Sequence, residues 1–238
     1  MKKYKNVVVL TGAGISQESG LNTFRGHEGL WENHRVEDVA TPEAFIRDPE
    51  LVYRFYNHRR ENLKNVEPNL AHFALSKLEE EFEGNVTIIT QNIDNLHERG
   101  GSNKILHMHG EVTKARCYKC GDVHPWDYDF DGGTSCPSCK IKPALRPHIV
   151  WFGEMPFFMN EINFALEQAD IFISIGTSGN VYPAAGFIAQ IRTIGSALTV
   201  ELNLEPSEGS HLFDVKHHGL ATKTVPKFIN KLLKAQIQ

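Results

Sequence analysis

This sequence has few cysteines, no long apolar run and no excess of basic residues, and each absence excludes a class of protein. The four apolar residues at 7–10 are too few for a signal-peptide core, and no run approaches the roughly 18 residues of a membrane span. With 25 Lys and Arg against 29 Asp and Glu, the net charge of −4 lacks the broad basic field of non-specific nucleic-acid binders. We therefore expect a soluble cytoplasmic protein that binds neither membrane nor specific nucleic acid.

The sequence does contain enough apolar material for a sizeable core. Hydrophobic residues make up 41% of the 238 and charged residues 23%, with 19 Gly and 11 Pro. This composition excludes a disordered or collagen-like chain. The length fits one large domain, or a large domain that carries a smaller insertion.

Short β-branched runs alternate with helical patterns along most of the chain. We expect strands over 7–10, 86–90, 170–175 and 197–202, and helices over 69–82, 159–168, 183–194 and 225–233. This alternation predicts an α/β fold with a parallel sheet, in which ligands bind at the carboxyl ends of the strands. The segments that follow the expected strands are 12–16, 91–94, 176–178 and 203–205.

Two stretches depart from the alternation. Residues 26–68 have helical patterns without a convincing strand, and residues 110–147 contain the cysteines and few apolar residues. We expect the two stretches to form a second, smaller lobe beside the sheet.

The four cysteines form two Cys-x-x-Cys pairs, Cys117 with Cys120 and Cys136 with Cys139. This spacing is typical of a four-thiolate zinc site, which has no open coordination position and is therefore structural. The alternatives are two disulfides, which are rare in intracellular chains, and a redox dithiol, which needs only one pair.

Two glycine-containing loops follow expected strands. Gly12, Ala13 and Gly14 resemble the start of a dinucleotide fingerprint, but Gln17 stands where that fingerprint has Gly or Ala. The second loop is 176–178. Each loop alone fits a nucleotide cradle or a plain tight turn, and their joint occurrence after two strands favours the cradle.

A polar segment follows the second expected strand and contains Gln91, Asn92 and Asp94. His107 and His109 lie shortly after it and would share one face of an extended segment. Either imidazole could act as a base near neutral pH. The sequence has twelve histidines, so a structural role for each remains open at this point.

These segments occur together in an order that resembles one family. The matching segments are Gly12-Ala-Gly-Ile-Ser, Thr90-Gln-Asn-Ile-Asp-Asn-Leu-His, His107-Met-His-Gly, the paired Cys-x-x-Cys, Phe152-Gly-Glu, Gly176-Thr-Ser and Asn203-Leu-Glu. In this order they resemble the sirtuins, NAD-dependent protein-lysine deacylases, over residues 6–233. Tyr56 and Arg59 form the Tyr-x-x-Arg pair of the desuccinylase-like class (class III), and the chain is most similar to its short bacterial members.

The resemblance implies that residues 1–238 form a single sirtuin-type catalytic unit. Its large Rossmann-like domain would comprise 1–25, 69–109 and 148–238. Its small lobe would combine a helical insertion, 26–68, with the zinc module, 110–147. NAD, consumed as a co-substrate, would bind between the two with the substrate.

The resemblance also implies a set of NAD-binding residues. They are Gly12, Ala13, Gly14, Phe24 and Arg25 for the NAD loop and its flap, Gln91, Asn92 and Asp94 for nicotinamide and its ribose, and Gly176, Thr177, Ser178, Asn203, Leu204, Glu205 and Ala221 for the adenosine side. One departure precedes the flap, where Asn22 and Thr23 replace the small apolar residue and proline that sirtuins more often have.

The mechanism implied by this resemblance begins when the acyl oxygen of the modified lysine attacks the anomeric carbon of the nicotinamide ribose. Nicotinamide leaves through a transition state with oxocarbenium character, as in glycoside cleavage. Asn92 and Asp94 would hold the ribose and carboxamide for this attack. His109 would then act as general base on a ribose hydroxyl, and water finally releases free lysine and O-acyl-ADP-ribose.

We expect the substrate to bind as an extended strand of another protein between the two lobes. Its backbone would pair with Gly153 and Glu154 on one side and with 181–182, including Val181, on the other. Phe152 is expected to line the acyl tunnel. Ordinary core packing is the alternative for the pair 151–152, and the role of Trp151 stays open.

The segment that follows Asp48 and Pro49 predicts a helix with Tyr56 and Arg59 on one stripe. Their hydroxyl and guanidinium can converge on one carboxylate, such as that of a succinyl or malonyl group. The alternative is an arginine at the edge of the stripe that pairs with a nearby acid. The resemblance favours the carboxylate, so we expect removal of acetyl and of succinyl or malonyl groups.

Two other functional classes are rivals at this stage. An NAD glycohydrolase or a protein ADP-ribosyltransferase would share the cleavage of NAD but would lack the acyl acceptor. A zinc module that binds nucleic acid or protein is disfavoured by the net charge of −4. We expect the enzyme to be a monomer.

Overall fold

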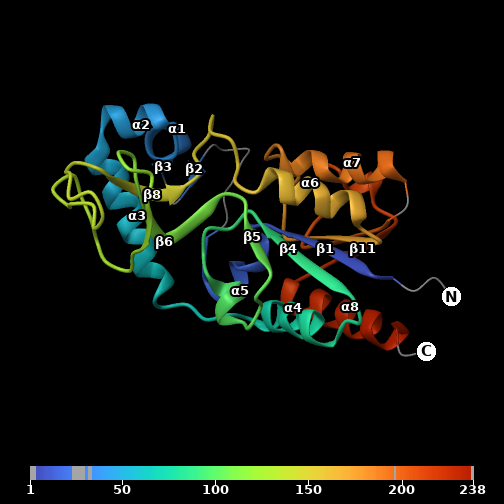
Figure 1. Ribbon diagram of the computed structural model, residues 1–238. Coiled ribbons are helices and arrows are strands. Elements are labelled where there is room, and N and C mark those ends of the chain that lie inside the picture. The colour runs from blue at the N-terminus through green and yellow to red at the C-terminus, as the bar shows by residue number, and fades with distance from the viewer. Residues whose placement is uncertain (1–3, 23–29, 32–33, 196, 237–238) are drawn as a thin grey trace.

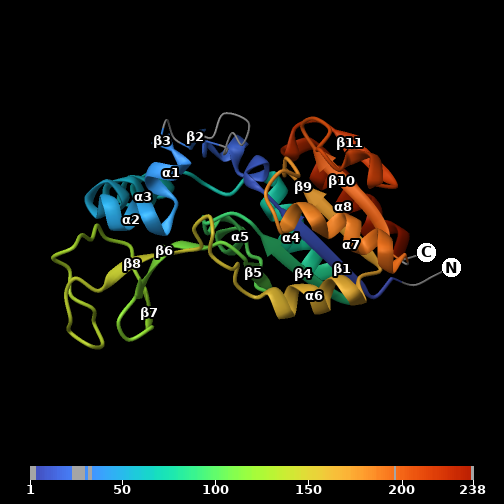
Figure 2. The ribbon, with the colours of Figure 1, turned by 90° about the horizontal axis from the view of Figure 1, so that it is seen from above.

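The computed structural model describes residues 4–22, 30–31, 34–195 and 197–236. The described chain forms a large lobe around a parallel sheet and a smaller lobe of helices and short strands beside it (Figures 1 and 2). The predicted α/β architecture with a second, smaller lobe is therefore confirmed.

The large lobe is built on a six-stranded sheet in the order β11-β10-β9-β1-β4-β5, and all neighbouring pairs are parallel. The strands are β1 (Asn6–Thr11), β4 (Asn85–Thr90), β5 (Ile105–His107), β9 (Ile171–Ile175), β10 (Leu198–Asn203) and β11 (Val215–His218). The four predicted strands are the four inner ones. The two edge strands were not predicted, because both are short and β11 is mostly exposed and polar.

Helices cover both faces of this sheet, which explains its almost uninterrupted apolar strands. Helices α4 (Leu70–Glu81) and α8 (Ala221–Gln236) pack on one face, and α6 (Met159–Gln168) and α7 (Phe187–Ile194) pack on the other (Figure 1). Neighbouring strand residues alternate between the two cores, so Val9 packs towards α4 and α8 while Val8 packs towards α6 and α7.

Two predicted helices differ from the observed ones at their starts. The expected helix over 183–194 begins with a 3-10 turn, η3 (Ala184–Gly186), before α7. Helix α8 begins at Ala221, before the predicted 225, because the Glu18 carboxylate accepts hydrogen bonds from the backbone and hydroxyl of Thr222. A cap supplied from so far along the chain has no local sequence signal.

The small lobe combines three helices with a three-stranded antiparallel sheet in the order β7-β6-β8. Its elements are α1 (Val36–Val39), α2 (Pro42–Arg47), α3 (Pro49–Leu63), β6 (Gly110–Cys117), β7 (Val123–Pro125) and β8 (Leu145–Ile149). Helix α3 starts as predicted, since Asp48 accepts a hydrogen bond from the Leu51 backbone and Pro49 is its first residue. The expectation of no strand in 26–68 was wrong, because β2 (Leu30–Trp31) pairs with β3 (His34–Arg35).

Short helical turns complete the described chain and join the larger elements. They are η1 (Ala13–Ile15), η2 (Gln17–Ser19), α5 (Leu96–Arg99) and η4 (Ser210–Leu212). In the part of the chain that the structure describes, none of the helices combines the length and apolarity of a membrane span.

Candidate active site

A cavity of about 510 Å³ lies between the two lobes, at the carboxyl ends of the parallel strands. It brings together the four strand-end segments that the sequence singled out. The predicted residues that line it are Gly12, Ala13, Gly14, Tyr56, Arg59, Gln91, Asn92, Asp94, His109, Phe152, Gly153, Glu154, Gly176, Thr177, Ser178, Val181, Asn203, Leu204 and Glu205.

Three further residues were predicted to bind NAD, and one of them is described. Ala221 is half-buried at the start of α8 and does not line the cavity. Phe24 and Arg25 lie outside the described residues, as does Thr23, whereas Asn22 is exposed and lines the cavity.

The two glycine loops are interlocked at the floor of the cavity. The Gly12 amide donates to the Ile175 carbonyl at 2.9 Å, and the Gly14 amide donates to the Gly176 carbonyl at 2.8 Å. A Cβ on Gly14 would lie 2.7 Å from the Gly176 Cα, and Gly176 itself has a φ of +62°. Only glycines allow this close approach, which leaves backbone groups uncovered next to the cavity.

A hydrogen-bonded chain joins the first glycine loop to the polar segment after β4. The Asn92 amide donates to the Ser16 hydroxyl at 3.1 Å, and this hydroxyl donates to the Asp94 carboxylate at 3.1 Å. Burial raises the pKa of Asp94, although the Leu96 amide and Ser16 favour its charged form. Ser16 was not predicted as a site residue, and its signal was only its place in the segment 12–16.

Thr177 connects the carboxyl ends of β4 and β10. Its hydroxyl accepts a hydrogen bond from the Gln91 side chain at 3.1 Å, and its carbonyl accepts one from the Asn203 side chain at 2.9 Å. Three strand ends, those of β4, β9 and β10, are thereby tied into one surface.

His109 lines the cavity and has the geometry of a general base. Its Nδ1 lies 3.0 Å from the Gln91 carbonyl oxygen, which can only accept, so Nδ1 carries the proton of the neutral ring. The second nitrogen, Nε2, then has the lone pair. Burial lowers the pKa of His109, against the opposing effect of this hydrogen bond, and keeps the ring neutral near pH 7.

The structure separates His107 from His109. The strand β5 ends at His107, whose buried Nε2 lies 2.6 Å from the Glu98 carboxylate, away from the cavity. Burial disfavours its charged form, but the hydrogen bond and charge of Glu98 outweigh burial and raise the pKa of His107. The two imidazoles therefore do not face the cavity together.

Glu201 supports the loop after β10 at the cavity and was not predicted as a site residue. Its side chain is 1% exposed and accepts hydrogen bonds from the Ser207 backbone and hydroxyl and from the Ser210 hydroxyl. It also contacts Nε2 of His218 at 2.9 Å. This carboxylate fixes the loop that contains the lining residues 204–206 and 208.

Tyr56 and Arg59 reach the cavity from α3, one turn apart as predicted. Tyr56 is fully buried, and burial raises its pKa, so its hydroxyl stays protonated. The Arg59 guanidinium lies 6.0 Å from the centre of the Phe55 ring and favours negative charge at Tyr56.

The segment expected to bind the peptide is held by an ion pair. Arg146 forms two hydrogen bonds with the Glu154 carboxylate, at 2.6 and 2.9 Å, and the Trp151 backbone amide donates to the same carboxylate at 2.8 Å. Trp151 belongs to the small-lobe core and also lines the cavity, and Phe152 is 46% exposed there. The carboxylate of Glu154 is therefore occupied by contacts within the protein, whereas Gly153 has only backbone atoms at the cavity.

The four cysteines form a closed cluster in the small lobe, away from the cavity. Their sulfurs all lie within 4.8 Å of one another, with 3.7 Å between Cys117 and Cys139 and 3.8 Å between Cys120 and Cys136. Sulfurs arranged tetrahedrally at about 2.3 Å from one Zn²⁺ are roughly 3.8 Å apart. The donor set and spacing therefore fit one structural zinc ion and exclude disulfides in this arrangement.

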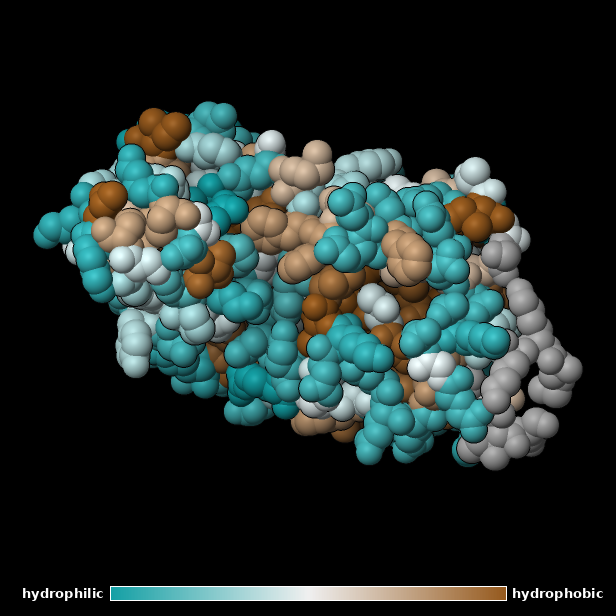
Figure 3. Space-filling model, viewed as in Figure 1, coloured by the Kyte–Doolittle hydropathy of each residue, from teal (hydrophilic) through white to brown (hydrophobic). Residues whose placement is uncertain are grey.

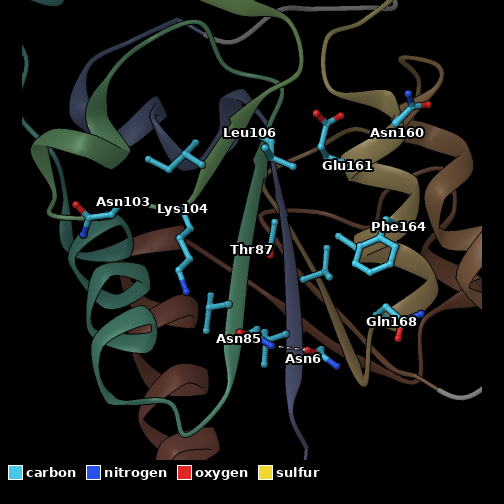
Figure 4. Close-up of a pocket in the computed structure, with 15 residues that line it drawn as sticks. Asn6, Asn85, Thr87, Asn103, Lys104, Leu106, Asn160, Glu161, Phe164 and Gln168 are labelled. Carbon is cyan, nitrogen blue, oxygen red and sulfur yellow. Dashed lines mark hydrogen bonds between the residues drawn. The ribbon is translucent and has the colours of Figure 1, made fainter.

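A second hollow, about 690 Å³ in volume, lies at the other ends of the strands and has none of this chemistry. It is an open groove on the sheet beside α6, with an apolar floor (Figure 3). Figure 4 shows Phe164 and Gln168 of α6 along one side and Lys104 on the other. Its charged lining residues are Lys104 and Glu161, and it contains none of the predicted site residues.

The fold and the site define an α/β protein with a cavity at the strand ends and a four-cysteine cluster in its smaller lobe, and comparison with known proteins gives its family. Residues 12–183 match the model of the Sir2 family. An NAD-dependent protein deacylase of Vibrio parahaemolyticus is 58% identical over 232 residues, covering 97% of this chain and 96% of that protein. One of Vibrio cholerae is 57% identical over 235 residues, covering 98% and 95%.

Solved structures agree with the sequence relatives. A Sir2 homologue in complex with NAD has a TM-score of 0.88 and 36% identity, covering 98% of this chain and 91% of that one. A Sir2 complex with a p53 peptide and NAD⁺ has a TM-score of 0.77 and 30% identity, covering 98% and 94%. The chain belongs to the Sir2 family.

Proposed function

We propose that this protein removes acyl groups from lysine side chains of other proteins and consumes NAD, with release of nicotinamide, O-acyl-ADP-ribose and free lysine. Membership of the Sir2 family and relatives at 56–59% identity that are named NAD-dependent protein deacylases support this activity. The observation that carries the proposal is the single cavity in which the strand-end loops meet His109 and the pair Tyr56 and Arg59.

The glycine loops are proposed to bind the diphosphate of NAD. Gly12 and Gly14 bring the backbone of the first loop to the edge of the cavity, and among the described residues they add no side chain there; their own amides donate to the carbonyls of Ile175 and Gly176 and hold the two loops together. The adenosine side is assigned to Asn203, Leu204 and Glu205, whose loop is fixed by the buried Glu201 carboxylate. NAD supplies the reactive ribose, from which nicotinamide is the leaving group.

Asn92 and Asp94 are proposed to orient the nicotinamide end. Both are 7% exposed at the cavity, and Ser16 connects them, so their positions are fixed before NAD binds. Gln91 is placed beside them by Thr177. Such preorganisation favours attack because the reacting groups need little rearrangement.

His109 is proposed to take the proton from a ribose hydroxyl. The Gln91 carbonyl fixes the tautomer with its lone pair on Nε2, and burial keeps the ring neutral near pH 7. The deprotonated sugar oxygen would then attack the carbon of the acyl group. Water would add to the same carbon as its bond to the lysine nitrogen breaks, so that free lysine leaves and the acyl group stays on ADP-ribose.

The modified protein is proposed to bind as an extended segment between the lobes. Gly153 has a φ of +91° and open space where a Cβ would stand, and Val181 lines the same cavity. Backbone pairing at these positions gives affinity for many sequences. Phe152 lines the same cavity, where it can contact the acyl chain.

Tyr56 and Arg59 are proposed to bind the distal carboxylate of succinyl- or malonyl-lysine. The two side chains line the same cavity from successive turns of α3, and a protonated hydroxyl and a guanidinium both donate to a carboxylate. Smaller acyl groups such as acetyl make no use of this pair.

The test replaces Arg59 with Met. A charged hydrogen bond contributes about 1.5–3 kcal/mol, so R59M is expected to lower kcat/KM for a succinyl-lysine peptide by one to two decades and that for the matched acetyl-lysine peptide far less. R54M on the exposed side of the same helix is the matched control and should change neither value. Equal losses on both peptides in R59M would refute the carboxylate assignment.

The remaining proposals concern the oligomeric state, the location, the substrate class and the domain division. The enzyme is proposed to act as a monomer in the cytoplasm. Its substrates are proposed to be proteins and not nucleic acid, and the net charge of −4 supports the exclusion of nucleic acid. Its large domain is proposed to comprise 1–25, 69–109 and 148–238, and its small lobe 26–68 and 110–147. Light scattering on the purified enzyme tests the monomer.

A further inference from the structure

Trp151 lines the cavity next to Tyr56 and is held by three contacts. It is 2% exposed, and its backbone amide donates to Glu154 at 2.8 Å. The Arg146 guanidinium stacks on its ring with 3.4 Å between the guanidinium carbon and the ring centre. Its indole Nε1 donates to the Tyr56 hydroxyl oxygen at 3.0 Å.

This last contact decides how the Tyr56 hydroxyl is oriented. The oxygen receives the indole N–H, so the phenolic hydrogen must point towards a different acceptor. A hydroxyl that accepts one hydrogen bond also becomes a better donor for the next. Trp151 therefore places Tyr56 as a donor, which is the role a carboxylate ligand needs.

We propose that Trp151 is a positioning residue for acyl-group selection, which acts through the Tyr56 hydroxyl and favours acyl chains that end in a carboxylate. This inference rests on the proposed function of Tyr56 and Arg59. Glu154 accepts hydrogen bonds from Arg146 and from the Trp151 backbone, and Trp151 donates to Tyr56. These contacts therefore connect Tyr56 to the segment that is proposed to pair with the peptide.

The simplest alternative is that Trp151 only fills the core. Its ring packs at 5.2 Å from the ring of Phe45 and belongs to the small-lobe cluster. Packing depends on the ring and not on the indole N–H, so a substitution that keeps an aromatic ring and removes the donor separates the two roles.

The test measures kcat and KM of W151F with matched succinyl- and acetyl-lysine peptides. Loss of one hydrogen bond is expected to raise KM for the succinyl peptide roughly two- to tenfold, with little change in kcat, so that the succinyl-to-acetyl ratio of kcat/KM falls by that factor. F45L is the control, because it loosens the packing around Trp151 but keeps the indole donor, and its ratio should equal that of the wild type.

A double-mutant cycle shows whether Trp151 acts through Tyr56. In a Y56F background the hydroxyl is already missing, so adding W151F should not lower the succinyl-to-acetyl ratio further. An unchanged ratio in W151F, equal losses on both peptides, or an additive effect in the double variant would each overturn the inference. If Y56F itself leaves the ratio unchanged, the proposed carboxylate site fails instead.

The wild-type protein provides a second measurement, in which variants serve only to assign signals. The sequence has three tryptophans, so ¹⁵N-labelled protein gives three indole signals that single Trp→Phe variants assign. The Trp151 indole N–H signal is expected to shift more with a succinyl-lysine peptide than with the acetyl peptide, both in the presence of NAD. Equal shifts with the two peptides would contradict the inference.

Discussion

Replacing Gly14 with Ala tests the interlocked glycine loops that form the floor of the cavity. The added Cβ would lie 2.7 Å from the Gly176 Cα and 2.8 Å from its carbonyl oxygen, whereas ordinary contacts begin near 3.4 Å. Both neighbours are backbone atoms, so no side chain can rotate away. The loop after β1 must separate from the loop after β9.

The expected cost follows from these contacts. Overpacking costs about 1–3 kcal/mol, and weakening the bond between the Gly14 amide and the Gly176 carbonyl costs about 1 kcal/mol more. The free energy of unfolding should therefore fall by about 2–4 kcal/mol, which corresponds to roughly 4–16 °C in Tm for a chain of this length. Because the same movement distorts the proposed diphosphate site, NAD affinity should fall at least about tenfold.

The assay combines denaturant unfolding with calorimetric titration of NAD. G132A is the matched control, because the nearest atom to its added Cβ, a side-chain oxygen of Glu50, lies at 3.7 Å. The control should unfold and bind NAD like the wild type. A G14A variant with unchanged stability and unchanged NAD affinity would refute the interlocked-loop reasoning.

Two further predictions concern the base and the metal. Burial lowers the pKa of His109, so the acidic limb of kcat/KM, where the imidazole becomes protonated, should be centred below the ordinary histidine value of about 6.5. An acidic limb centred above pH 7 would contradict the assignment. H109Y should abolish turnover and largely retain NAD binding. Chelation should remove one zinc per chain and unfold the cysteine module. The variant C120S should contain less zinc by atomic absorption and should be less stable than the wild type. Unchanged stability after removal of the metal would contradict a structural zinc site.

The parallel sheet and the location of the cavity were predictable because their signals are local. Buried strands between covering helices appear as continuous apolar runs, and the carboxyl ends of parallel strands meet at one edge. The segments 12–16, 91–94, 176–178 and 203–205 therefore line one cavity, as expected. The cysteine spacing was equally local, and the sulfurs meet in one cluster.

The supporting residues could not be predicted, because their partners are far away in the sequence. Ser16 contacts Asp94 across 78 residues, and Trp151 contacts Tyr56 across 95. The carboxylate of Glu201 gains its role only when the following loop folds back onto it. Strands β6, β7 and β8 also lack a clear pattern, because the stretch 110–147, which contains most of their residues, has few apolar residues.

The fate of the acyl group tests the proposed reaction most directly. The protein is incubated with NAD and matched acetyl- and succinyl-lysine peptides, and the products are identified by mass spectrometry. We expect equal amounts of deacylated peptide, nicotinamide and O-acyl-ADP-ribose. Nicotinamide released together with free ADP-ribose, with both peptides still acylated, would contradict deacylation and indicate an NAD glycohydrolase.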